Sequence, residues 1–313
     1  MSRASEIAVP AKVEKLASEA GATLRKVSNR ASREIVARVP FIRDRDLRRR
    51  EERRIAHAPN IPVLSTADQE LVDRLGREGA VVTSLDELAL PGTDELKARL
   101  AEVGSRLEAR SADGPSTFWA TNDELADEAI LWRWGMSERL LDIVENHLGL
   151  PARYYGGEVR CEVADTGTYT VRQWHRDVED DRLFKILIWL NDVDDEGGPF
   201  EFVQRPRTDI ATTDLSYVSG FVSDDDLAQA VPRSEWNAAV GDTWTAVIAD
   251  TSTIFHRAKP PTGRNRYSAT FTYSTWHPRK LYPKVPFSDS QTASIRDGLS
   301  KRQNSSLPDV IGF

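Results

Sequence analysis

His175 and Asp177 lie two residues apart in a β-like run, and a third residue that could bind a metal ion together with them, His256, follows far along the chain. Side chains two apart on a strand project to the same face, so His175 and Asp177 point to one side and Arg176 points away. His256 lies in a second β-like run, Thr253 to Ala258. A barrel or jelly roll brings such distant strands together, and this requirement constrains the fold more than any other feature.

Two imidazoles and one carboxylate are a donor set for a catalytic metal ion. They occupy one side of the ion and leave the opposite positions open, as a non-haem Fe(II) centre requires when it binds a co-substrate and O₂ together. Zinc accepts the same residue types, and a catalytic zinc site also has three protein ligands and one open position. The ligand types therefore indicate a metalloenzyme and leave the metal open.

The segments around these residues follow an ordered series. The motif Gln173-Trp174-His175-Arg176-Asp177 precedes an apolar strand, the acidic turn Asn191 to Glu196, and Gly197-Gly198-Pro199. Gly241-Asp242 then opens a strand, and Arg266 follows the distal histidine. This order resembles the phytanoyl-CoA dioxygenase-like branch of the Fe(II)/2-oxoglutarate oxygenases, over about residues 150 to 278.

The resemblance implies a mainly β fold with flanking helices, in which a double-stranded β-helix (jelly-roll) core carries the site. It implies three iron ligands, His175, Asp177 and His256. One departure concerns the substrate side, because the family often has a Pro-Gly-Ser-His turn where this chain reads Val203-Gln204-Arg205-Pro206-Arg207. We therefore expect the iron site to follow the family more closely than the cover over it.

The resemblance also implies that Arg266 holds the far carboxylate of 2-oxoglutarate. A guanidinium suits this role because its planar fork makes two parallel, charge-assisted hydrogen bonds to a carboxylate. Arg264 has the same strand parity and competes for the role, but it lies in a turn, whereas Arg266 begins a β-rich run. Ser268, Lys185 and Gln173 are further candidates to contact the co-substrate.

The implied reaction couples oxidative decarboxylation of 2-oxoglutarate, with release of succinate and CO₂, to oxidation of a substrate C–H bond. Halogenating relatives have a small residue in place of the carboxylate ligand, so Asp177 favours hydroxylation or desaturation of a small molecule. Two alternatives remain open at this stage. One is a zinc hydrolase that uses the same three ligands, and the other is a non-catalytic jelly-roll binding module.

The rest of the chain suggests four regions. We expect a basic helical arm over residues 1–60, a helical support region over 61–150, the catalytic core over 151–280 and a C-terminal tail over 281–313. The polar segment 204–237 reads as a long loop, and long loops in compact domains are often functional covers. It is therefore the predicted lid.

Local patterns predict several elements before the core. Thr66-Ala67-Asp68-Gln69 has the form of a capping box and predicts a helix that begins there. A short strand is expected over 79–82, and apolar residues at helical spacing predict a helix over 96–107. Ser137 is the expected cap of a helix that ends at Leu148. His147 falls in the last turn of that helix, where a solvent-exposed histidine is expected.

Composition indicates a soluble, cytoplasmic enzyme. Cys161 is the single cysteine, so the chain has no intrachain disulfide framework. The sequence has no long apolar run and no signal-peptide pattern. The basic cluster Arg43 to Arg54 contains acids at helical spacing, which is typical of a salt-bridged exposed helix, so we expect no nucleic-acid partner.

Overall fold

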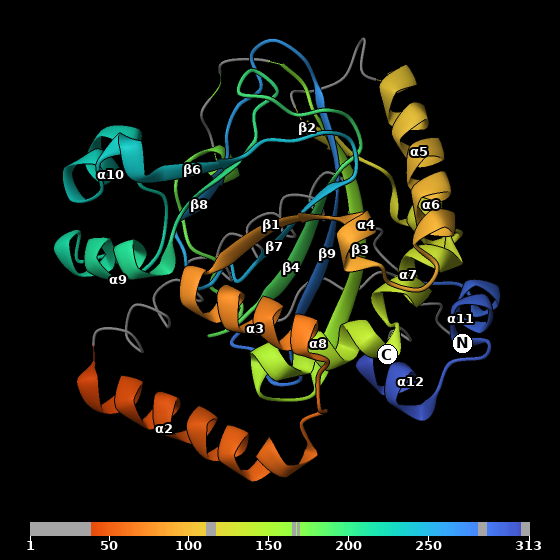
Figure 1. Cartoon of the computed structure of the whole chain (residues 1–313), viewed down its shortest axis with the longest axis horizontal. Coiled ribbons are helices and arrows are strands. Elements are labelled where there is room, and N and C mark those ends of the chain that lie inside the picture. Colours follow the sequence, from red (N-terminus) through yellow and green to blue (C-terminus); the bar gives the residue numbers. More distant parts are fainter. Residues whose placement is uncertain (1–38, 111–116, 165–166, 168–169, 281–286, 308–313) are drawn as a thin grey trace, which may run out of the picture. The chain divides into compact units, whose positions relative to one another are not determined.

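The computed structural model describes residues 39–110, 117–164, 167, 170–280 and 287–307, and its strands form two antiparallel sheets (Figure 1). The large sheet has the strand order β1-β7-β4-β9-β3-β2, and the small sheet has the order β6-β5-β8. From β4 to β9 the chain passes back and forth between the two sheets, with β5 and β6 together in the small sheet, and this is the connectivity of a double-stranded β-helix. The predicted fold class is confirmed. The strand bounds are β1 (Ala80–Ser84), β2 (Thr117–Trp119), β3 (Ala152–Glu162), β4 (Phe184–Trp189), β5 (Phe200–Val203), β6 (Trp236–Ala239), β7 (Thr245–Ala249), β8 (His256–Ala258) and β9 (Arg266–Thr275).

Helices precede, interrupt and follow the strands. Among them, α5, α7 and α8 pack against β3 on one face of the large sheet, whereas α9 and α10 lie together beside the small sheet (Figure 1). The bounds of the α-helices are α2 (Pro40–His57), α3 (Thr66–Glu78), α4 (Leu85–Leu88), α5 (Thr93–Arg110), α6 (Asn122–Ala126), α7 (Ala129–Gly135), α8 (Glu138–Leu148), α9 (Arg205–Asp214), α10 (Asp224–Ala230), α11 (Asp289–Arg296) and α12 (Lys301–Ser306). Short 3₁₀ turns are η1 (Ala58–Asn60), η3 (Thr170–Arg172) and η4 (Arg233–Glu235).

Strand β9 shows how the large sheet separates core from site. Its alternate residues Ala269, Phe271 and Tyr273 are buried in the main apolar core between the sheet and the helices. The intervening residues face the other way and are all polar, and they too are buried: Arg266, Ser268, Thr270, Thr272 and Ser274. Burial of polar groups is unfavourable unless they find partners. This polar inner face therefore marks the part of the fold that serves chemistry.

A second apolar cluster fills part of the space between the two sheets. It includes Leu187 and Trp189 of β4, Val247 of β7, and Phe200 and Phe202 of β5. The turn before β5 lies close to the loop that follows β8. Gly198 in this turn has φ +69°, and a Cβ atom added at this position would lie 2.4 Å from the backbone nitrogen of Pro261. That approach requires a glycine.

The segment 204–237 is not a long loop as predicted. It forms α9, α10 and η4 before it enters β6. A third apolar cluster anchors it, in which Ala211 of α9 and Leu227 of α10 pack with Trp174 and Phe255. Short polar helices with a narrow apolar stripe resemble loops in sequence, and tertiary burial of that stripe decides the structure.

Two local predictions before the core also need correction. Helix α3 is capped by Ser65, whose Oγ accepts a hydrogen bond from the Asp68 amide, and Thr66 is the first helical residue. His147 is not on the surface but is 6% exposed, and its Nε2 lies 3.0 Å from Oδ2 of the buried Asp250. By contrast, the predicted strand near residue 80 is confirmed as β1, which pairs with β7.

The chain divides into two compact units, residues 1–52 and 53–313. In the described part of the first unit, α2 carries an ion pair of the expected spacing between Arg50 Nε and Asp46 Oδ2, 3.2 Å apart. Residues 1–38 of the predicted arm lie outside the described residues. None of the helices in the described ranges is both long enough and apolar enough to span a membrane.

Candidate metal centre

Backbone pairing brings the two candidate histidines together. The amide of His175 donates to the carbonyl of His256 and the amide of His256 donates back, each over 3.0 Å. The Asp177 amide donates to the Thr251 carbonyl over 2.9 Å. The segment that carries His175 and Asp177 is thus held against β8 and the turn before it. Main-chain hydrogen bonds therefore fix the backbone that carries the His175, Asp177 and His256 side chains.

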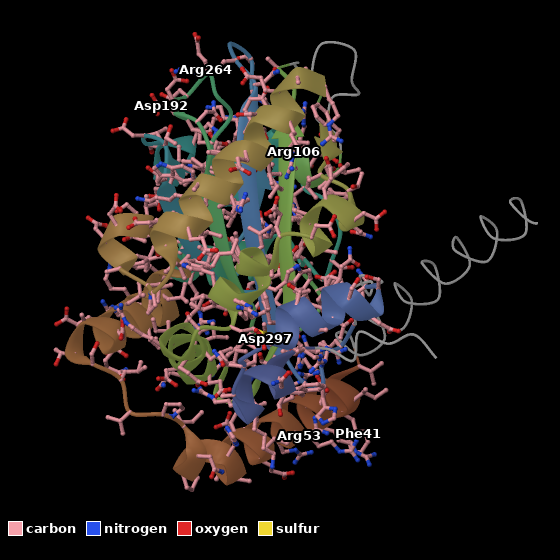
Figure 2. The ribbon with its side chains drawn as sticks, turned by 90° about the vertical axis from the view of Figure 1, so that its right-hand side faces the viewer. Phe41, Arg53, Arg106, Asp192, Arg264 and Asp297 are labelled. Carbon is pink, nitrogen blue, oxygen red and sulfur yellow. The ribbon has the colours of Figure 1, made fainter. Side chains whose placement is uncertain are left out.

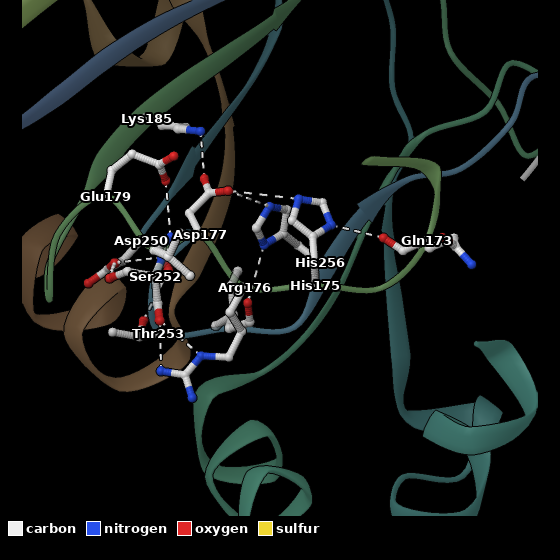
Figure 3. A network of polar contacts seen from close by, with 12 residues as sticks. Gln173, His175, Arg176, Asp177, Glu179, Lys185, Asp250, Ser252, Thr253 and His256 are labelled. Atoms are coloured by element: carbon white, nitrogen blue, oxygen red, sulfur yellow. Dashed lines mark hydrogen bonds and ion pairs between the residues drawn. The ribbon is translucent and has the colours of Figure 1, made fainter. Parts of the chain in front are cut away.

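The three side chains converge on one point (Figure 3). Oδ1 of Asp177 lies 3.8 Å from His175 Nε2 and 3.9 Å from His256 Nε2. One possible ligand atom from each residue falls within 4.8 Å of the other two. Their residues are buried or half-buried. This spacing lets one metal ion contact all three with little movement.

The opposite edge of each imidazole is held by a backbone carbonyl. His175 Nδ1 lies 2.9 Å from the Gln173 carbonyl oxygen, and His256 Nδ1 lies 3.2 Å from that of Ile254. A carbonyl oxygen only accepts, so each Nδ1 carries a proton, and in the neutral form of the ring Nε2 then presents its lone pair to the other two side chains. Metal-binding histidines are commonly oriented in this way.

Electrostatics keep the carboxylate ionised and one imidazole neutral. Burial by itself would raise the pKa of the Asp177 carboxyl, but the Lys185 ammonium and the two imidazoles hold it well below its usual range. Lys185 Nζ lies 2.6 Å from Oδ2, the oxygen that faces away from the histidines. Burial and the neighbouring His175 lower the pKa of His256 to about 3. An anionic oxygen and a neutral nitrogen are the forms that bind metal.

Arg266 and Ser268 lie deep on the same inner face of the large sheet. Each is 1% exposed, and neither Arg266 Nε nor Ser268 Oγ has a hydrogen-bond partner among the described residues. The guanidinium lies over the Trp189 ring, 5.6 Å from its centroid. Burial, and after it the nearby Arg160, lower the pKa of Arg266 to about 9, which still leaves a cation at neutral pH.

Several charged side chains of the described residues lie around Arg266. Glu162 is its neighbour across the β3–β9 pairing, but Arg172 binds that carboxylate, with Nη2 2.9 Å from Oε2. Arg160 adds a third guanidinium 3.7 Å from the other oxygen of Glu162. Arg172 and Arg160 therefore both lie against the Glu162 carboxylate, and Arg160 also lies 3.8 Å from Glu158 Oε1. Within the described residues, Arg266 forms no ion pair of its own, and an unpaired buried charge is costly.

Burial separates the two arginines that the sequence left in competition. Arg264 is exposed, forms an ion pair with Asp194, and points outward at the same end as Asp192 (Figure 2). Arg266 points inward and is buried. Strand parity alone could not make this distinction, because the residues share it.

The remaining candidates occupy different positions. Lys185 contacts the carboxylate of Asp177, and its predicted contact with a co-substrate stays a prediction. Gln173 contributes its backbone carbonyl to His175, and its side chain points away from the imidazoles (Figure 3). Trp174 faces away from the site and packs in the cluster with α9 and α10, as its parity predicts.

Sequence reasoning did not single out two groups near the centre. Phe221 lies between α9 and α10, is 51% exposed, and packs edge-on against His175 with ring centroids 5.5 Å apart. No sequence signal indicates this contact, because it depends on how the segment 204–237 folds back. Arg160 could have been identified from the sequence, because it lies two residues before Glu162 in β3 and therefore shares a face of the strand with it.

No family model and no curated protein matches this chain. Solved structures with a similar fold include EctD from S. alaskensis with 2-oxoglutarate and 5-hydroxyectoine (TM-score 0.48, 16% identity, 68% of this chain and 76% of that one). HygX from Streptomyces hygroscopicus with nickel and 2-oxoglutarate gives a TM-score of 0.46 at 14% identity, covering 69% and 88% of the two chains. The epimerase SnoN in complex with Fe³⁺, alpha ketoglutarate and nogalamycin RO gives 0.45 at 19%, covering 67% and 84%. A functional assignment must therefore rest on the side chains of this chain.

Proposed function

We propose that this protein is an Fe(II)- and 2-oxoglutarate-dependent oxygenase that oxidises a C–H bond of a small molecule. The observation that supports it best is the combination of a three-donor site with a buried arginine, Arg266, whose Nε has no hydrogen-bond partner among the described residues. A zinc hydrolase would use the first feature only. A binding module without catalysis would need neither the two converging imidazoles nor the carboxylate beside them.

His175, Asp177 and His256 would hold the iron, because two neutral imidazoles and one carboxylate suit Fe(II) and leave positions open for other ligands. Lys185 binds the outer oxygen of Asp177, so the inner oxygen points at the histidines. Bound iron would supply the activation of O₂ and the oxidative decarboxylation of 2-oxoglutarate to succinate and CO₂. The protein residues contribute orientation and exclusion of water.

Arg266 and Ser268 would bind the far carboxylate of 2-oxoglutarate. The guanidinium offers an unpaired Nε–H deep in the fold, and the Ser268 hydroxyl beside it is likewise unpartnered among the described residues. Trp189 forms an aromatic wall under the guanidinium. A carboxylate bound here would satisfy these donors and balance the charge of Arg266.

Hydroxylation or desaturation is the proposed outcome rather than halogenation. Asp177 occupies the position at which a halogenating centre needs space for a halide, and its carboxylate is held in place by Lys185. The substrate is proposed to be a small molecule. Phe221, exposed beside His175, is the side chain best placed to contact it.

Anaerobic titration of the Fe(II)-loaded protein with 2-oxoglutarate tests the proposal. We expect a weak visible charge-transfer band, because a 2-keto acid that chelates ferrous iron absorbs there. Arg266→Gln should raise the concentration of 2-oxoglutarate needed for half-saturation by about tenfold or more, since it removes a charge-assisted hydrogen bond. Arg264→Gln is the matched control and should change it little, because Arg264 is exposed.

The same titration can reject the proposal. No band in protein shown by metal analysis to contain one iron per chain would exclude chelation by the keto acid. A larger effect of Arg264→Gln than of Arg266→Gln would move the carboxylate site to the surface turn. In either case zinc binding and hydrolase activity would be measured next.

A further inference from the structure

A second arginine lies on the inner face of the large sheet, at the other end of β9 from Arg266. In the pairing of β3 with β9, Glu162 is opposite Arg266 and Arg153 is opposite Ser274. A bulge between Tyr154 and Gly157 shifts the register, yet Tyr154 still faces the apolar core. Arg153 therefore points to the polar inner face.

Arg153 lies against two aromatic rings and forms no ion pair with an acidic side chain of the described residues. Its guanidinium carbon lies 5.4 Å from the centroid of the Tyr155 ring and 5.0 Å from that of Trp276. Its Nε is buried and has no hydrogen-bond partner within the described ranges. Aromatic faces stabilise a guanidinium but leave its N–H donors unsatisfied. All three side chains are half-buried, so a ligand can reach them.

The position of Arg153 relates it to the candidate metal centre. Thr272 is paired with Lys185, which binds Asp177, and Ser274 lies two residues further on the same face of β9. Two strand spacings and two residues along the strand place the Cα atoms of Lys185 and Arg153 on the order of 12 Å apart. Arg266 is at the opposite end of the strand, so 2-oxoglutarate bound there would leave Arg153 free.

Hydrogen bonds hold this part of the sheet in place. Tyr155 Oη lies 3.1 Å from Ser274 Oγ. The Thr275 amide and hydroxyl both donate to Asp180 Oδ2, over 3.1 and 2.6 Å, and Asp180 closely follows Asp177 in the chain. The segment that carries the metal ligands is thus tied to the end of β9 beside Arg153. A group bound at Arg153 would be fixed relative to the metal.

We propose that Arg153, between Tyr155 and Trp276, binds a carboxylate of the organic substrate and so orients that substrate toward the metal centre. The inference rests on the proposed function and names the substrate class: a small organic acid with apolar or aromatic character near its carboxylate. A guanidinium makes two parallel hydrogen bonds to a carboxylate, and the two flat rings restrict the approach to the plane of the fork.

The inference is tested by comparing how a carboxylate and its neutral carboxamide bind to the Fe(II)-loaded protein. The measurements are made under anaerobic conditions and at saturating 2-oxoglutarate. The probes are aliphatic and aromatic monocarboxylates and N-acetyl amino acids, each with its neutral carboxamide, and binding is measured by saturation-transfer NMR and calorimetry. We expect carboxylates to bind and carboxamides to bind at least about tenfold more weakly, because a hydrogen bond to a charged group is lost.

Variants assign the effect to Arg153. Arg153→Gln should weaken carboxylate binding by about tenfold or more and remove the preference over carboxamides. Arg153→Lys keeps the charge but loses the fork, so its binding should be intermediate. Arg264→Gln is the matched control on an exposed arginine and should behave as the wild type. Undisturbed 2-oxoglutarate binding in each variant shows that the fold and the metal centre are intact.

The outcomes separate the two proposals. If no carboxylate in the panel binds in an Arg153-dependent way while 2-oxoglutarate still binds, the inference about Arg153 is wrong and the oxygenase assignment stands. Equal binding of carboxylates and carboxamides also overturns it. If 2-oxoglutarate itself does not bind the iron-loaded wild type, the proposed function fails first.

Discussion

At the scale of single residues, the candidate metal centre depends on which side-chain atoms are held by hydrogen bonds and which are left available. Backbone carbonyls hold the Nδ1 atoms of His175 and His256, and Lys185 holds one oxygen of Asp177. The atoms that face one another are therefore the two Nε2 nitrogens and one oxygen of Asp177.

Lys185 provides the residue-scale prediction. Lys185→Met should weaken Fe(II) binding about 10- to 100-fold, the usual effect of losing a group that orients a metal ligand. The reason is that Asp177 would no longer be fixed with Oδ1 toward the histidines. The affinity for Fe(II) is measured by an anaerobic Fe(II) titration with calorimetry as the readout. A rise in affinity would contradict the idea and show that the ammonium competes with the metal.

At the scale of elements, caps and short apolar stripes decided where helices begin and which segments fold. Ser65 caps α3, with its Oγ 3.2 Å from the Asp68 amide. The segment 204–237 becomes helical because α9 and α10 bury Ala211 and Leu227. Helix propensity alone gives short helices little stability, so the formation of α9 and α10 depends on the side chains that pack against them.

The cap of α3 gives an element-scale prediction with a built-in control. Ser65→Ala should lower the free energy of unfolding by about 1 kcal/mol, because the Asp68 amide loses its acceptor at the helix start. Thr66→Ala should change it by no more than about 0.5 kcal/mol, since Thr66 is exposed. Urea unfolding followed by circular dichroism compares the two. The opposite ranking would restore Thr66 as the cap.

At the scale of the whole molecule, buried carboxylates link distant parts of the second unit. Asp250, in the turn after β7, lies beside His147 of α8 and accepts a hydrogen bond from the Leu183 amide over 3.1 Å. Burial raises the pKa of Asp250, but His147 and further hydrogen bonds outweigh it and leave the pKa below its ordinary value. Asp68, which Arg139 binds, has a pKa lowered chiefly by that bond.

These shifts predict how stability depends on pH. A carboxyl with a lowered folded-state pKa contributes stability above its unfolded pKa of about 4, and this contribution is lost as the pH falls further. The free energy of unfolding of the metal-free protein should therefore decrease as the pH falls below about 4. Urea unfolding between neutral and acidic pH measures it, and Asp68→Asn should flatten the curve. A stability that is constant or rises on acidification would contradict the prediction.

Sequence spacing by itself determined the face shared by His175 and Asp177, the orientation of Trp174 away from them, and the need for a fold that brings His256 to the pair. These follow from the two-residue period of a strand, which is a local property. Only the tertiary structure showed that Arg266 is buried while Arg264 is exposed, that His147 is buried, that the segment 204–237 is helical, and that Arg153 lies against two aromatic rings. Each of these depends on burial and on partners distant in the chain, and a local pattern carries no information about either.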